Sequence, residues 1–401
     1  MIGLDDLART PNALAPHYSR FRVAERLLLT GHSHQAWPDV ARTAQLQAFD
    51  DAAELVDAKW DRAFAVADEV RAGFRRLLGD PDGEIALGGS THDLVIRFLS
   101  ALDLTGRRHR LVASSGEFHT LRRQLSRLAE AGIDVEWIAA EPVGTLAERM
   151  ADAADERTAA VLVSAVLFET ARVVPHLGAL ADACRQRGTE LLVDAYHALG
   201  VVPFPIGELG LTGAWVVGGG YKYLQLGEGN CFLRLPAHAE RLRPVVTGWF
   251  AAFDTLVEPA RDAPVVYGPG AQRFAGATYD PTSHYRAARV FRFFDERGLT
   301  PTLLRGSYLH QLDVLARAFD ALGAPDAVVA RDRGTPLTSV GGFLALRTPH
   351  SQQLHESLTK RDVSTDTRGP YLRLGPAPYL ADAQLEAAID ALADALRELG
   401  R

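Results

Sequence analysis

One lysine of the chain lies in an unusually apolar, glycine-rich stretch. Lys222 is the centre of VVGGGYKYLQLGEG, and the preceding stretch LLVDAYHALG contains Asp194 and His197. Burying an ammonium group costs free energy and lowers its pKa, and a lysine with a lowered pKa is a nucleophile that can form a Schiff base with a carbonyl group. The alternative is a structural lysine that caps a helix or pairs with Glu228.

Asp194 follows the apolar run LLV, which predicts that it ends a buried strand. The carboxyl ends of strands are where open α/β sheets bind ligands. A carboxylate there could hold the protonated ring nitrogen of pyridoxal phosphate and keep the ring an electron sink. Together, Asp194 and Lys222 favour a pyridoxal phosphate site.

A second stretch, GGSTHDL at 88–94, has the composition of a phosphate-binding turn. It follows the strand-like EIALGG and precedes a helical run, so Ser90 and Thr91 are expected at a helix N-terminus. Backbone amides and the helix dipole favour an anion at such a position, and hydroxyl groups complete the site. The alternative is an ordinary N-cap, in which Ser90 or Thr91 only satisfies the first turn.

The elements that must position these residues alternate between strand and helix. Between residues 108 and 215, β-rich runs alternate with amphipathic runs such as LRRQLSRLAEAG and HLGALADACRQRG. This alternation is typical of βαβ units, so we predict a mainly parallel sheet with helices on both faces. The stretch from Pro38 to Leu78 predicts helix that ends at Gly79 and breaks in two near residues 57–61.

These stretches resemble fold-type I pyridoxal phosphate enzymes of aminotransferase class V, and YKY followed by LxLGxG is most similar to kynureninase. Further similar stretches follow in order over most of the chain: LLTGHSHQAWP, GGSTHDL, GEFHT, GWF and YLRLGPAPY. The resemblance implies an α/β fold, with a large domain built on a mainly parallel seven-stranded sheet and a smaller α+β C-terminal domain. We expect an N-terminal segment at 1–37 that contributes to the small domain and the site mouth, a large domain at 38–282 and a small domain at 283–401.

The resemblance also implies roles for individual residues. Lys222 would carry the Schiff base, and Asp194 would hold the protonated ring nitrogen. His197 would support Asp194 or the phosphate region. Phe118 would stack on the ring, with His119 as the second candidate. The residues expected at the phosphate are Ser90, Thr91, Tyr221, Trp249 and Thr278.

On the substrate side, the resemblance implies that Arg373 grips a carboxylate by two parallel hydrogen bonds, a geometry that lysine cannot reproduce. Its alternative role is a surface cation on an edge strand. His32 and Ser33 lie in the segment that forms the mouth of the site in the family, so they are candidates for substrate contact; the alternative is a polar turn. No metal site is expected, because His32 and His34 alone lack further ligands.

Several substrate-side positions depart from the kynureninase pattern. Glu169 occupies the place of a tyrosine, Gly276 that of an asparagine, and a Gly-His turn expected before Trp60 has no counterpart. Glu169 could supply a proton only if burial raised its pKa. The cofactor half of the pattern is kept while the substrate half differs, so we predict a different amino acid and only feeble activity on kynurenine.

The resulting prediction is a pyridoxal phosphate enzyme acting on an α-amino acid, either a kynureninase-like C–C hydrolase or a related lyase. A class V aminotransferase and a C–S lyase remain alternatives, as does a catalytically silent regulatory protein that binds the cofactor. Desulfuration is the least favoured reaction, because it needs a cysteine on a mobile loop. Cys231 lies in an apolar strand-like run and Cys184 in a helical one.

Composition limits the other possibilities. The net charge of −7 is spread without long blocks, which argues against nucleic acid or an anionic membrane as the main partner. The two cysteines indicate a reducing, cytoplasmic setting, and the chain has neither a signal-peptide pattern nor 18 consecutive apolar residues. The resemblance implies a homodimer with shared active sites, in which GATYD at 276–280 crosses over and VTGWFAAF at 246–253 is buried at the interface.

Overall fold

The computed structural model of the chain describes residues 2–255 and 264–399. Its centre is a seven-stranded sheet in the order β2-β8-β7-β6-β5-β3-β4. Only β8 runs antiparallel to its neighbours, and the other pairs are parallel. The predicted mainly parallel sheet is therefore confirmed. The strands are β2 (Glu84–Gly88), β3 (Arg110–Ser114), β4 (Asp134–Ile138), β5 (Thr158–Ser164), β6 (Glu190–Asp194), β7 (Trp215–Gly219) and β8 (Cys231–Leu235).

Helices cover both faces of this sheet, as the alternating sequence pattern predicts. On one face, Leu94 and Phe98 of α4 pack with Leu162 of β5. On the other face, Phe74 of α3 and Leu180 of α7 share a core with Val161. Strand β5 is buried along its whole length because both of its faces are covered. The helices are α3 (Lys59–Leu78), α4 (Thr91–Ser100), α5 (His119–Glu130), α6 (Leu146–Ala153) and α7 (Leu177–Arg187).

The predicted break in the first helical region is also confirmed. Helix α2 (Val40–Leu55) ends at Val56, and α3 begins at Lys59. Helix α3 ends at Gly79, whose φ of 57° is left-handed, a conformation that glycine adopts without steric cost. Helix α8 (Thr282–Arg297) lies against both α2 and α3.

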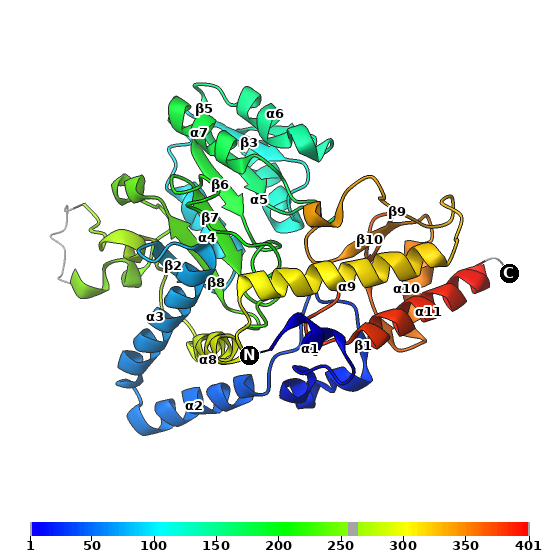
Figure 1. Ribbon diagram of the computed structural model, residues 1–401. Helices are drawn as coiled ribbons and strands as arrows, with labels where there is room; N and C mark the ends of the chain where they lie inside the picture. The colour runs from blue at the N-terminus through cyan, green and yellow to red at the C-terminus, as the bar shows by residue number, and fades with distance from the viewer. Residues whose placement is uncertain (1, 256–263, 400–401) are drawn as a thin grey trace.

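A smaller antiparallel sheet lies at the other end of the molecule (Figure 1), in the order β12-β13-β10-β9. All of its strand pairs are antiparallel, and helices pack beside it, as expected for a smaller α+β region near the C-terminus. Its elements are α9 (Pro301–Ala321), β9 (Ala330–Arg331), β10 (Leu344–Arg347), α10 (Ser351–Thr359), β12 (Asp366–Arg368), β13 (Tyr371–Leu374) and α11 (Asp382–Leu399).

The N-terminal segment lies beside this smaller sheet. After α1 (Leu4–Ala8), strand β1 (Leu27–Leu28) pairs in parallel with β11 (Val363–Ser364). The N–H of Gly31 also donates to the carbonyl of Gly375, 2.8 Å away. The segment that contains His32 is thereby held against the end of β13. The division of the chain at residues 37 and 282 stays a prediction.

Candidate active site

The candidate site lies at one edge of the large sheet, where the parallel strands end. Asp194 is the last residue of β6, Lys222 follows the end of β7, and the turn before α4 follows the end of β2. These ends meet at one edge because β2 and β7 are both antiparallel to β8 and hence parallel to each other. They surround a cavity of about 300 Å3, whose lining includes Ser90, Thr91, Phe118, Asp194, Tyr196, His197, Tyr221, Lys222 and Cys231.

Lys222 has the environment of a reactive amine. Its side chain is buried, and its Nζ lies 2.6 Å from Nε2 of His197. Burial lowers the pKa of Lys222 to about 7, against the opposing charge of Asp194 and with help from Arg373. Near neutral pH a substantial fraction of the amine is therefore unprotonated and nucleophilic.

His197 is a neutral partner for this amine. Burial and the neighbouring charge of Lys222 hold the pKa of His197 well below its usual value. Nε2 faces Lys222, while the buried Nδ1 has no hydrogen-bond partner among the described residues. An imidazole in this setting can accept a hydrogen bond from the amine at Nε2 and keep its own N–H at Nδ1.

Asp194 is held by the backbone that follows it. Its Oδ1 accepts the N–H of Tyr196 at 2.7 Å. Burial raises the pKa of Asp194, while this hydrogen bond and the charge of Lys222 oppose the rise. A positive group brought against this carboxyl would therefore stabilise its ionised form.

The turn before α4 combines both roles that its sequence suggests. Ser90 is the N-cap of the ten-residue helix, and its Oγ accepts the N–H of Asp93 at 3.1 Å. Its O–H remains a donor, and Thr91 lies beside it in the lining of the cavity. An anion at this end of the helix would meet free backbone amides and the positive end of the helix dipole.

Aromatic rings line the remaining walls. Phe118 precedes α5 and meets Phe168 edge to face at 5.4 Å, whereas His119 is exposed. Tyr221 lies between the ring of Tyr196, 5.0 Å away, and the ring of His34, stacked at 4.9 Å. Burial raises the pKa of Tyr221 to about 12, so its hydroxyl is a donor at neutral pH.

Arg373 is buried and already has a partner. Its Nε and Nη2 donate to the two oxygens of Asp366, at 2.8 and 2.5 Å, and its Nη1 donates to the carbonyl of Phe168. Three of the five guanidinium N–H groups are used in this way, which leaves two for a further ligand. The predicted grip on a substrate carboxylate therefore has to use these two N–H groups.

The structure corrects the expectation for His32. The imidazole is almost fully buried, Nε2 lies 2.8 Å from Asp366, and burial lowers the pKa of His32 to about 4. The neutral ring therefore donates to Asp366 and supports the Asp366–Arg373 pair, and any influence on substrate is indirect. Its neighbour Ser33 is half-buried, and its hydroxyl lies 3.1 Å from Nδ1 of His34.

Like His32, Ser33 and Arg373, three further predicted site residues are absent from the lining of the Lys222 cavity. Glu169 is exposed after β5, so the burial that its predicted proton-donor role requires is absent. Trp249 and Thr278 are also exposed, and Nε1 of Trp249 donates to the hydroxyl of Thr278 at 3.3 Å.

Two acidic residues near the site were not identified from the sequence. Glu117 is fully buried and bonds to the backbone and hydroxyl of Ser164, and Asp366 holds Arg373. Asp366 could have been found from its register, because it lies opposite Arg373 in the β12–β13 hairpin. The signal for Glu117 is an acid directly before Phe118 in a turn after a strand.

The residues of the cavity fit pyridoxal phosphate. A helix N-terminus with two hydroxyls suits a phosphate, a buried carboxyl suits a ring nitrogen, and a buried amine of lowered pKa suits an aldehyde. The unpartnered Nδ1 of His197 leaves one more polar group for a ligand. Within the described part of the chain, no group of three or more His, Cys, Asp or Glu side chains is arranged to hold a metal ion.

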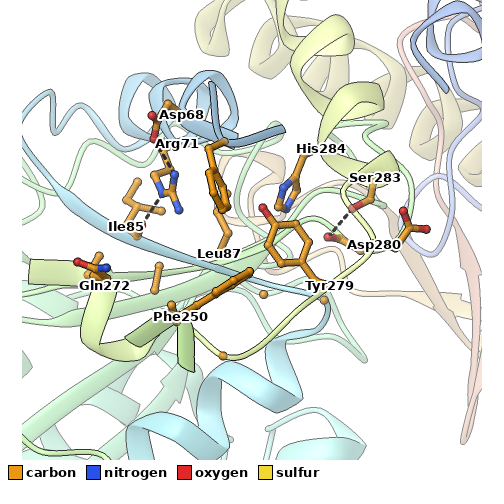
Figure 2. Close-up of a pocket in the computed structure, with 18 of the residues that line it drawn as sticks. Asp68, Arg71, Ile85, Leu87, Phe250, Gln272, Tyr279, Asp280, Ser283 and His284 are labelled. Atoms are coloured by element: carbon orange, nitrogen blue, oxygen red, sulfur yellow. Dashed lines mark hydrogen bonds and ion pairs between the residues drawn. The ribbon is translucent and has the colours of Figure 1, made fainter. Parts of the chain in front are cut away.

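A larger cavity of about 870 Å3 adjoins the Lys222 cavity and shares Gly89, Glu228 and Gly229 with it. Figure 2 shows Phe250 and Tyr279 among the side chains around it. This cavity contains no lysine, so we assign the chemistry to the smaller one and regard the larger one as adjoining space.

None of the helices in residues 2–255 and 264–399 combines the length and apolar composition needed to cross a membrane.

Comparisons with known proteins identify relatives in sequence. No protein-family model matches the chain. The kynureninase of Deinococcus radiodurans is 29% identical over 342 residues, which cover 84% of this chain and 79% of that protein. The uncharacterized aminotransferase YcbU of Bacillus subtilis is 24% identical over 355 residues, which cover 87% of this chain and 89% of that protein.

Solved structures share the fold. A mutant of C-DES with glycine covalently linked to its pyridoxal phosphate cofactor gives a TM-score of 0.80 at 16% identity, over 94% of this chain and 98% of that chain. A cysteine desulfurase from Thermococcus onnurineus gives a TM-score of 0.79 at 15% identity, over 97% of this chain and 99% of that chain. At these identities the likeness extends to the fold alone.

Proposed function

This chain is a fold-type I protein of the aminotransferase class V superfamily, similar in sequence to kynureninases, and we propose that it is a pyridoxal phosphate enzyme acting on an α-amino acid. The observation that carries the proposal is the buried amine of Lys222, 2.6 Å from a neutral His197 in a cavity that also contains Asp194. A structural lysine would be expected to pair with a carboxylate, but the nearest polar partner of Lys222 is an imidazole.

The residues of the chain would divide the binding of the cofactor among them. The turn at Ser90 and Thr91 would hold the phosphate, Asp194 would hold the ring nitrogen, and Phe118 would cover one face of the ring. His197 and Tyr221 would donate hydrogen bonds from the walls. When bound, pyridoxal phosphate supplies an electron sink for negative charge that develops at the α-carbon of an amino acid.

Lys222 would then serve as the proton carrier of the site. An amine whose pKa lies near 7 is well matched to both taking up and returning a proton at neutral pH. The two remaining N–H groups of Arg373 would orient the carboxylate of the substrate. Asp366 and His32 keep the guanidinium in place for that contact.

For the reaction, we propose cleavage of a side-chain bond by a kynureninase-like C–C hydrolase or a related lyase, with a substrate other than kynurenine. Similarity to the Deinococcus kynureninase over most of the chain supports this choice. The departures at Glu169 and Gly276 support a changed substrate. The 870 Å3 cavity beside the site leaves room for the side chain of the amino acid.

The structure gives no support to desulfuration through a cysteine. Both cysteines are buried, and burial raises the pKa of each thiol to about 12, so neither is a thiolate at neutral pH. C–S cleavage without a cysteine and transamination remain the second candidates. YcbU supports the latter, since it is described as an aminotransferase.

We also propose that the enzyme is a homodimer that shares its sites. Apolar side chains of residues 245–253 and 265–266 are exposed together: Val245, Val246, Trp249, Phe253, Val265 and Val266. The two segments are neighbours, because Arg243 donates to the carbonyl of Val265 at 2.8 Å. Exposed apolar groups that cluster in this way favour burial by a partner.

A substrate screen tests the proposed function. Purified protein loaded with pyridoxal phosphate is mixed with single amino acids, and absorption changes of the bound cofactor identify those that react. Alanine plus a carboxylic acid as products would support hydrolytic C–C cleavage, while pyruvate with ammonia would indicate β-elimination. A requirement for an oxo-acid acceptor would indicate transamination, and failure of the protein to bind the cofactor would refute the proposal.

A further inference from the structure

Glu117 is a buried acid that the proposed function leaves without a role. It lies in the turn between β3 and α5, directly before Phe118, and its side chain is inaccessible to solvent. Its Oε1 accepts the N–H of Ser164 at 2.9 Å, and its Oε2 lies 2.7 Å from the hydroxyl of the same residue. Ser164 ends β5, so one side chain ties the turn before α5 to the neighbouring strand.

The same contact brings Glu117 close to Asp194. In the register of β5 and β6, Ser164 is the partner of Asp194, so their side chains leave the sheet on the same face. Glu117 and Asp194 both line a small internal cavity, together with Phe118 and His92. Two carboxyl groups thus line the same small cavity, beside the residue predicted to stack on the ring.

Electrostatics favours one negative charge on this pair rather than two. Burial raises the pKa of Glu117 to about 8; the hydroxyl of Ser164 opposes this rise and the charge of Asp194 adds to it. Asp194 has the N–H of Tyr196 and the charge of Lys222 to stabilise its ionised form. Neighbouring buried carboxyl groups that share one charge titrate as a pair.

We propose that Glu117 is a positioning residue of this site: its protonated carboxyl fixes the Phe118 turn to β5 and leaves the single negative charge of the pair on Asp194. The inference rests on the proposed function in one respect, namely that the charge of Asp194 faces the pyridine ring of a bound cofactor. In the structure Oε1 accepts the Ser164 amide and Oε2 accepts the Ser164 hydroxyl. In the protonated form the hydroxyl would instead accept the Oε2–H, so a hydrogen bond is kept at both oxygens. Glutamine can copy this arrangement, with its amide N–H as the donor.

The first test uses the protein without cofactor and compares thermal unfolding of wild type and Glu117→Gln between pH 5 and 9. Burial raises the pKa of Glu117 from its ordinary value of 4.5 to about 8, so the folded state holds an extra proton between these two pH values. The stability contributed by protonated Glu117 is complete below pH 4.5 and is lost as pH rises through 8.

Glutamine keeps the uncharged arrangement at every pH, so the Tm of Glu117→Gln minus that of wild type should rise from pH 5 to about pH 8 and level off above it. The other titratable groups that face this turn are Asp194 from β6, His92 from α4 and Lys222 beyond Asp194. His92 and Lys222 are present in both proteins and cancel to first order, whereas the coupled titration of Asp194 is part of the effect that is measured. A difference that is constant or falls with pH would overturn the proposal.

The second test measures binding of pyridoxal phosphate by equilibrium dialysis and visible circular dichroism. Glu117→Ala should weaken binding by about tenfold or more and change the dichroism of the bound cofactor, because it frees the Phe118 turn and leaves the Ser164 amide without its partner. Glu117→Gln should restore the Kd to within about threefold of wild type. Ser164→Ala, which keeps the amide bond and removes the hydroxyl, is the matched control and should fall between them.

Equal impairment of Glu117→Gln and Glu117→Ala, or binding by Glu117→Ala as tight as wild type, would overturn the positioning role. If wild type binds no pyridoxal phosphate, the proposed function fails. The pH dependence of unfolding still tests whether Glu117 is protonated in the folded protein. If Glu117→Ala does not fold, the glutamine variant decides through the pH dependence of its Tm.

Discussion

The family resemblance assigns residues of two regions to the same active site: the Lys222 cavity, and the exposed segments at 245–253 and 265–266. The two regions differ in burial, because the residues of the cavity are enclosed and Trp249 is exposed. In the cavity, Lys222, Asp194 and His197 are enclosed, and burial shifts the pKa of each. Trp249 in the second region is 44% exposed, and its indole N–H reaches only Thr278. The comparison separates groups that one chain encloses by itself from groups that it leaves exposed.

The largest expected effect is at the centre of the cavity. Lys222→Ala should reduce turnover by roughly 10²–10⁴-fold or more, because it removes both the nucleophile and the proton carrier. Borohydride reduction and peptide mapping of the loaded wild-type protein should find the pyridoxyl group on Lys222. The chain has two other lysines, Lys59 and Lys360, and the exposed Lys360 provides the control variant. Label on either of them would contradict the assignment.

Asp194→Asn is the next most severe change. The amide cannot hold a positive charge on the ring nitrogen, so turnover should fall by about 10²–10³-fold while cofactor affinity falls much less. The measurement is kcat alongside the Kd for pyridoxal phosphate. Unchanged turnover would exclude Asp194 from the chemistry, and an equal loss in both quantities would make its role one of binding only.

Arg373→Lys tests whether the buried guanidinium contributes to substrate binding. A lysine cannot reproduce the side-on pair with Asp366 and a second pair of bonds to a carboxylate, so KM should rise by about tenfold or more. Arg347→Lys, an exposed position on the adjacent strand β10, is the matched control. If the KM of Arg373→Lys stays at the wild-type value, the two free N–H groups do not hold the substrate.

A smaller effect is expected in the exposed region. Trp249→Ala should weaken cofactor binding by about three- to tenfold and favour the monomer, if the residue completes the site of a second copy. Phe49→Ala, a 72% exposed aromatic on α2, is the control. Sedimentation supplies the readout, and a wild-type monomer that binds the cofactor tightly would mean that one chain is sufficient.

The smallest effect is a stability difference in the cofactor-free protein. Burial lowers the pKa of Lys222 from its ordinary value of 10.5 to about 7, so wild-type stability should rise with pH between 7 and 10.5 and be lost as pH falls through 7. Lys222→Met carries no such charge and should unfold a few degrees higher than wild type at pH 7. The gap should narrow toward pH 10. A gap independent of pH would mean that the amine is not buried.

Local sequence patterns predicted most of the fold. Alternating runs indicated the parallel sheet, and the helix signals from Pro38 to Gly79 indicated α2 and α3 with a break between them. These features depend on side-chain periodicity and on the backbone preferences of proline and glycine, which act within a few residues. The same local patterns brought Ser90, Asp194 and Lys222 to one edge of the sheet, although their catalytic and binding roles stay predictions.

Burial and pairing at the site were beyond sequence reasoning. Glu169 could act as the predicted proton donor only if it were buried, and it is exposed, whereas Glu117 was passed over and is fully buried. His32 was expected at the mouth of the site and instead supports Asp366 from behind. In each case the environment of the side chain is set by segments far away in the chain, which a pattern of neighbouring residues does not describe.

The sequence by itself determined the elements, their order, and the residues that stand at the ends of the strands. Only the tertiary structure decided which of those residues share a charge, a proton or a hydrogen bond. Glu117 meets Ser164 across 47 positions, and Arg373 meets Phe168 across 205. The physical reason is that the pKa of a buried group depends on desolvation and on charges within a few ångströms, and both arise only when distant strands come together.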